Sequence, residues 1–157
     1  MHEIYSDYYL WVLFSQTRDA ILKARERELH THHISERHAQ LLFIIELIGH
    51  NASPAKISRW LLREPNSISE IIDRMEKQGL LKKIKDLDRK NQVRIEVTEK
   101  GHKVYQRSFI PRNIPEILSV LTESDRKRLI SSLMKLRKAA IEHIGIRYHV
   151  PLPPIDQ

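Results

Sequence analysis

Apolar side chains in the first quarter of the chain recur at helical intervals. No proline or glycine interrupts residues 4–28, which predicts one long helix. Its apolar positions are spaced by three or four residues: Ile4, Tyr8, Trp11 and Phe14. Around residues 8–14 the helix is apolar on every side, and such a helix is buried on more than one face. In so short a chain a second subunit is the simplest cover, so we expect a homodimer.

Helix-start and helix-stop signals divide the next segment. Ser35 can cap a helix that runs to Gly49. Two further helices begin where a proline occupies the first helical position, at Ser53-Pro54 and at Glu64-Pro65. Gly79 ends the second of them. Two short helices joined by a tight turn are typical of a helix-turn-helix.

After Gly79 the spacing of apolar residues changes from the period of a helix to the alternation of a strand. Residues 80–85 and 92–97 have the character of strands, and the polar tip 86–91 between them predicts a hairpin. Thr98 can cap the next helix, which Pro111 and Pro115 interrupt. Thr122 and Asp125 resemble a capping box for a last helix ending at Gly145, and an extended tail follows. The expected fold is mainly α with a small β-hairpin: a winged helix-turn-helix flanked by amino- and carboxyl-terminal helices.

Charge and composition narrow the function classes. The chain has 157 residues, no cysteine and a net charge of +7, which fits one domain and excludes disulfide scaffolds and thiol chemistry. Residues 56–94 hold 11 basic and 6 acidic side chains, whereas residues 1–55 hold 5 and 7. Residues 101–157 hold a further 10 basic and 5 acidic side chains, a surplus that the sequence does not explain. The predicted helix-turn-helix and hairpin are strongly basic for their length, and the two features together point to double-stranded DNA as the partner.

The second helix of the helix-turn-helix carries the candidate chemistry. Its isoleucines fall on one side and its polar residues on the other, where amide, hydroxyl and guanidinium groups can pair with base edges in a major groove. The candidate base contacts are Asn66, Ser67, Ser69, Glu70 and Arg74. Arg89 and Lys90 occupy the wing tip, where they can enter a minor groove. The candidate phosphate contacts are Lys56, Arg59, Lys82, Lys83, Lys85 and Arg94.

The segments 66–80, 86–90 and 97–101 together resemble the MarR family of transcriptional regulators. The resemblance implies a homodimer that binds a pseudopalindromic operator, favours a repressor, and often includes release by a small ligand. The resemblance makes residues 1–157 a single unit. The DNA-binding region spans residues 35–100, and the dimerisation helices lie in residues 1–30 and 102–145. Residues 146–157 form an extended tail. This chain departs from the usual pattern in having Glu70, Lys90 and Val97.

The histidine-rich segment before the second helix offers an alternative. Imidazoles are good zinc or copper ligands, and the candidates for a metal-responsive regulator are His30, His32, His33 and His38. Their spacing is not a standard ligand pattern, and histidines near a helix end also satisfy carbonyl groups. We therefore expect no certain cofactor and consider a metal the weaker interpretation.

Other classes have less support from the sequence. No phosphate-binding loop or nucleophile elbow is present, so an enzyme is not expected. A winged helix used only for protein contacts would place apolar residues at the candidate base-reading positions, which are polar instead. The apolar run 8–14 is too short to span a membrane, so we expect a cytoplasmic protein without a membrane partner. A pocket for a small aromatic ligand could be lined by Trp11, Trp60 and Tyr105, although core packing is the commoner role of such residues.

Overall fold

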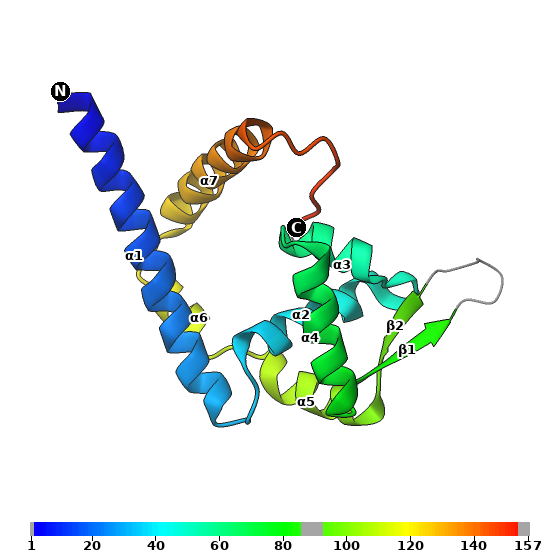
Figure 1. The fold of residues 1–157 in the computed structure, drawn as a ribbon. Coiled ribbons are helices and arrows are strands. Elements are labelled where there is room, and N and C mark those ends of the chain that lie inside the picture. Colours follow the sequence, from blue (N-terminus) through cyan, green and yellow to red (C-terminus); the bar gives the residue numbers. More distant parts are fainter. Residues whose placement is uncertain (1, 86–92, 154–157) are drawn as a thin grey trace.

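A computed structural model describes residues 2–85 and 93–153 and confirms the mainly helical fold with one hairpin (Figure 1). The elements in chain order are α1 (His2–His30), α2 (Glu36–Ile48), the 3-10 turn η1 (Gly49–Asn51), α3 (Pro54–Leu61), α4 (Pro65–Lys77), β1 (Leu81–Lys85), β2 (Val93–Val97), α5 (Glu99–Phe109), α6 (Asn113–Leu118) and α7 (Glu123–His143). The strands pair antiparallel, with Leu81 opposite Val97 and Lys85 opposite Val93.

Side-chain caps fix the starts of several helices where the sequence predicted them. The Ser35 hydroxyl accepts from the His38 amide at 3.3 Å, and the Ser53 hydroxyl accepts from the Lys56 amide at 3.4 Å. Thr122 and Asp125 form the capping box at the start of α7. The hydrogen bonds from Thr122 hold the pKa of the Asp125 carboxyl below its usual value. Each cap satisfies amide groups that a helix start leaves unpaired.

Helix α6 was not predicted by the sequence pattern. The chain leaves the helical conformation at Ile110 and re-enters it at Asn113, so Pro111 interrupts the helix as expected. Pro115 lies within the first turn of α6, where a missing amide hydrogen costs no intrahelical bond. Pro111 therefore separates α5 from α6, whereas Pro115, also expected to interrupt the helix, lies inside α6.

The hydrophobic core lies between α2, α3, α4 and the hairpin. Its fully buried large side chains include Leu41, Leu42, Ile57, Ile68, Ile72, Met75 and Ile95. The Ile95 amide donates to the Ala52 carbonyl at 2.9 Å, which joins β2 to the start of α3. Gly101 lies so close to the Leu80 carbonyl that a Cβ there would be 2.2 Å from the oxygen. The hairpin is thus held against the helical core at its base and at the middle of β2.

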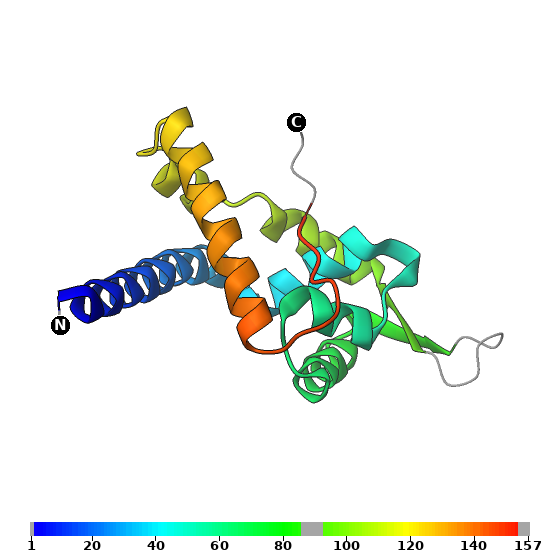
Figure 2. The same ribbon diagram turned by 90° about the horizontal axis from the view of Figure 1, so that it is seen from above.

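Helices α1 and α7 extend from this core as two arms (Figures 1 and 2). Many of their large apolar side chains are exposed: Tyr5, Tyr8, Tyr9, Leu10, Trp11, Leu13 and Phe14 on α1, and Leu129, Ile130, Leu133, Met134 and Leu136 on α7. None of the helices described is both long and apolar enough to cross a membrane. In the described chain, α1 and α7 therefore both expose apolar side chains that no other element fully covers.

A buried guanidinium joins the α1 arm to the core. Arg25 is 9% exposed, and its Nη1 atom lies 2.9 Å from a Glu28 carboxylate oxygen. Its Nη2 atom donates to the Ser108 carbonyl at the end of α5. The other Glu28 oxygen accepts from the Arg112 amide at 2.6 Å. Burial alone would raise the pKa of Glu28, but these hydrogen bonds outweigh it and hold the pKa below its usual value.

Replacing Arg25 by methionine is expected to lower the free energy of unfolding by about 3 kcal/mol, because it leaves Glu28 and the Ser108 carbonyl without their buried partner. Urea unfolding followed by circular dichroism measures the change. Arg27→Met, at an exposed position on the same helix, should cost less than about 0.5 kcal/mol. Equal losses in the two variants would show that Arg25 has no special structural role.

Candidate nucleic-acid interface

The turn between α3 and α4 sets the angle at which α4 is presented. Leu62 ends α3 in the left-handed conformation with φ 50°, which is uncommon for a residue with a side chain. The Arg63 amide closes the turn by donating to the Ser58 carbonyl at 3.1 Å. Pro65 then begins α4 with its fixed φ. The tight turn leaves α3 and α4 packed against each other, as in a helix-turn-helix.

Core packing determines which face of α4 meets solvent. Ile68, Ile71, Ile72 and Met75 are buried, so the opposite face of the helix is polar and exposed. The exposed predicted base contacts are Asn66, Ser69, Glu70 and Arg74, whereas Ser67 is half-buried. The Arg74 Nε atom donates to the Glu70 carbonyl at 3.3 Å, and the Ser69 hydroxyl donates to the Pro65 carbonyl at 3.0 Å. Four of the five predicted positions therefore share one accessible surface.

Most of the predicted phosphate contacts on the hairpin are already paired with carboxylates. Lys82 Nζ and Arg94 Nη2 lie 2.8 and 2.7 Å from the two oxygens of Glu96. Lys83 Nζ contacts Asp73, and it lies 3.3 Å from Glu76. The hydrogen bond to Asp73 raises the pKa of Lys83. These cations can meet phosphate only in competition with internal ion pairs.

The Lys83 ion pairs also have a structural consequence. They connect β1 to the exposed side of α4, and the Lys83 amide adds a hydrogen bond to Glu76 at 2.9 Å. Lys85, in contrast, is exposed at the end of β1. The predicted wing-tip residues Arg89 and Lys90 lie outside the described residues. The base of the wing is therefore fixed to α4 by charged contacts that the sequence pattern did not reveal.

The two cations predicted on α3 differ in their surroundings. Both Lys56 and Arg59 are exposed, and Lys56 lies in the first turn of the helix. The Cζ atom of Arg59 lies 5.3 Å from the centre of the Tyr148 ring, which comes from the carboxyl-terminal tail. No sequence signal identified Tyr148, because it is 89 residues away along the chain. The tail thus reaches the surface of the helix-turn-helix.

The predicted metal cluster does not form in the described part of the chain. Within residues 2–85 and 93–153, no group of three or more His, Asp or Glu side chains is arranged to hold a metal ion. The four candidates are His30, His32, His33 and His38. They are close in sequence, but His30 ends α1 and His38 lies in the first turn of α2. Burial lowers the pKa of His38, and the charge of Arg74 lowers it further. Within one described chain, the four histidines therefore do not assemble a metal site.

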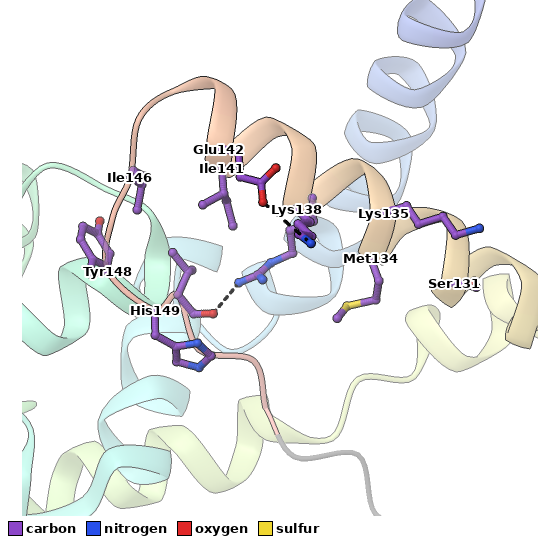
Figure 3. A pocket seen from close by; sticks show the side chains of 11 residues that line it. Ser131, Met134, Lys135, Lys138, Ile141, Glu142, Ile146, Tyr148 and His149 are labelled. Carbon is purple, nitrogen blue, oxygen red and sulfur yellow. Dashed lines mark hydrogen bonds and ion pairs between the residues drawn. The ribbon is translucent and has the colours of Figure 1, made fainter.

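The three aromatic residues considered for a ligand pocket have different environments. Trp60 and Tyr105 pack against the core, whereas Trp11 is 63% exposed on the α1 arm. A cavity of about 630 Å³ instead lies between α7 and the tail, with Met134, Arg137, Ile141, Tyr148 and Val150 among its lining residues (Figure 3). A second, of about 380 Å³, is lined by Lys23, Glu26, Arg27 and His30. Neither cavity involves the predicted aromatic set.

Comparison with known proteins identifies the domain. Residues 34–101 match the family model of a winged helix DNA-binding domain. These residues include α3, α4 and both strands, so the matched segment contains every predicted base and phosphate contact. No curated protein matches the sequence.

Solved structures extend the likeness beyond that domain. The organohalide-sensing transcriptional regulator RdhR-CbdbA1625, bound to 2,4-dichlorophenol, is 29% identical with a TM-score of 0.85 over 96% of this chain and 90% of its own. A mutant of E. coli MarR complexed with operator DNA is 16% identical with a TM-score of 0.75, over 81% and 92%. The S. aureus MepR–DNA complex is 18% identical with a TM-score of 0.73, over 82% and 96%. The chain therefore contains a winged helix DNA-binding domain and has the fold of the MarR-family structures, which confirms the resemblance to MarR-family transcriptional regulators in fold.

Proposed function

We propose that the protein is a sequence-specific transcriptional repressor that binds a pseudopalindromic operator as a homodimer, with α4 in the major groove and the wing at the minor groove. The observation that carries this proposal is the exposed polar face of α4, whose opposite face is locked into the core. Amide and guanidinium groups on this face can each make two hydrogen bonds to a base edge. The amino terminus of α4 adds a favourable dipole for phosphate.

The homodimer is supported by the two arms. Exposed apolar side chains concentrate on α1 and α7, and large exposed apolar patches mark protein interfaces. A two-fold dimer would bury the same helices of both copies. Two copies of α4 would then face the same side of one DNA duplex. We expect the two arms to be the dimerisation helices and the region between them to bind DNA.

We further propose that a small aromatic ligand releases the operator. This rests on the likeness to RdhR-CbdbA1625, which was solved with 2,4-dichlorophenol and shares 29% of its sequence with this chain. Phenolic compounds are the class to titrate against the protein–DNA complex.

Base reading by α4 is testable once a bound site has been selected from random duplex DNA. Asn66→Ala and Arg74→Ala should each weaken binding by about 1–3 kcal/mol, because each removes a two-bond contact to one base. Operators with single base-pair changes, measured by fluorescence anisotropy, locate the position at which each variant no longer discriminates. Arg128→Ala, at an exposed position on α7, serves as control. A loss that is uniform over all operators would assign these residues to backbone contacts.

The salt dependence of binding separates the paired cations from the exposed ones. Lys56→Gln and Lys85→Gln should each flatten the plot of log K against log salt by about one unit, the value for one phosphate contact. Lys83→Gln should change the slope much less, because Lys83 is already paired with Asp73 and Glu76. Titrations between about 50 and 200 mM salt measure the slopes. Equal changes in all three variants would show that the internal ion pairs open on DNA.

A further inference from the structure

The carboxyl-terminal tail runs back from the end of α7 toward the DNA-binding region (Figures 2 and 3). Its described part, residues 146–153, follows Gly145, whose φ of 71° turns the chain out of the helix. The tail is held at one point by Arg137 of α7. The Nη2 atom of that residue donates to the Val150 carbonyl at 2.8 Å and to the Pro151 carbonyl at 3.3 Å.

The anchored segment is ordered by packing as well as by hydrogen bonds. Val150 is 5% exposed, although it lies only three residues before the last described position. Hydrogen bonds from a charged donor such as Arg137 are stronger than those between neutral groups. The two contacts fix the backbone just after Tyr148. The tyrosine ring is thereby presented to a fixed place on the surface.

That place is Arg59 of α3. The Cζ atom of Arg59 lies 5.3 Å from the Tyr148 ring centre, a distance at which a cation is attracted to the ring face. The guanidinium lies over the ring, and a guanidinium carries five N–H donors, more than one ring contact can engage. Arg59 also remains exposed. A phosphate oxygen can therefore accept from Arg59 while the ring stays in contact.

The tail also joins two parts that have little other contact. Helix α7 is connected near its start by Arg126, which donates to the Leu118 carbonyl at 2.5 Å. At its other end the tail leads to α3, the helix that directly precedes α4. The same contact thus restrains the Arg59 side chain and the position of the DNA-binding region relative to α7.

We propose that Tyr148 is a positioning residue for operator binding: it orders the Arg59 guanidinium for a DNA phosphate, and Arg137 holds the tail that carries it. This inference rests on the proposed function, because it assigns a tail residue to the same DNA-binding surface. The opposite role, a tail that covers Arg59 and competes with DNA, is an outcome of the test.

The test uses the full-length protein and its selected operator. Tyr148→Leu keeps an apolar side chain but removes the ring, and it should weaken operator binding about two- to fivefold, the equivalent of one exposed cation–π contact. Tyr148→Phe keeps the ring and should bind like the wild type. In an Arg59→Gln background, Tyr148→Leu should cause no further loss, because its effect passes through Arg59.

Arg137→Gln tests the anchor. It should weaken binding in the same direction as Tyr148→Leu, whereas Lys135→Gln removes the same charge from the same helix without releasing the tail and should bind more tightly than Arg137→Gln. Circular dichroism and light scattering check that each variant keeps its helix content and subunit number. Light scattering also identifies any variant that fails to assemble. A variant that keeps its subunit number but binds more weakly than Tyr148→Phe has lost the ring contact rather than its assembly.

The outcomes separate the two proposals. A wild-type protein that selects no DNA overturns the proposed function itself. A wild-type protein that selects an operator, with Tyr148→Leu binding equally well, overturns only the role of Tyr148. Tighter binding by Tyr148→Leu would assign the tail to covering Arg59. A loss that is equally large with and without Arg59 would show that Tyr148 does not act through the guanidinium.

Discussion

Burial of one face of α4 is the interaction on which the functional surface depends. Ile68, Ile72 and Met75 are fully buried, and burying a side chain of this size contributes about 1.5–3 kcal/mol. Because a helix has a fixed period, locking this face into the core also fixes the polar face that meets solvent. The residue types on the exposed face then determine which groups α4 can recognise.

The sequence predicts those parts of the structure that depend on neighbours along the chain. Ser35, Ser53 and Thr122 cap helices as expected, since a cap is made within a few residues. The isoleucine spacing of α4 likewise predicts which of its faces is buried. Four of the five candidate base contacts are exposed together for the same reason. The α1 arm is also visible in advance, because its stretch 8–14 is apolar on every side and cannot be covered by one small core.

Contacts between distant residues could not be predicted in this way. Arg25 and Ser108 are 83 residues apart, and nothing near Arg25 indicates that it would be buried. The Lys83 ion pairs changed the interpretation of the hairpin, because lysines that alternate along a strand look equally accessible to phosphate. The histidine-rich segment shows the same limit of local reasoning: closeness in sequence does not by itself bring these side chains into a three-ligand group within the described chain. Long-range packing decides which charged groups remain accessible to DNA.

Hydroxyl-radical footprinting of the selected operator tests the central claim most directly. The account requires two copies of α4 on one face of the duplex, so it predicts two protected half-sites about 10 base pairs apart, centre to centre, related by a two-fold axis. A single protected segment without an internal repeat, or protection that does not depend on sequence, would contradict a dimeric sequence-specific regulator.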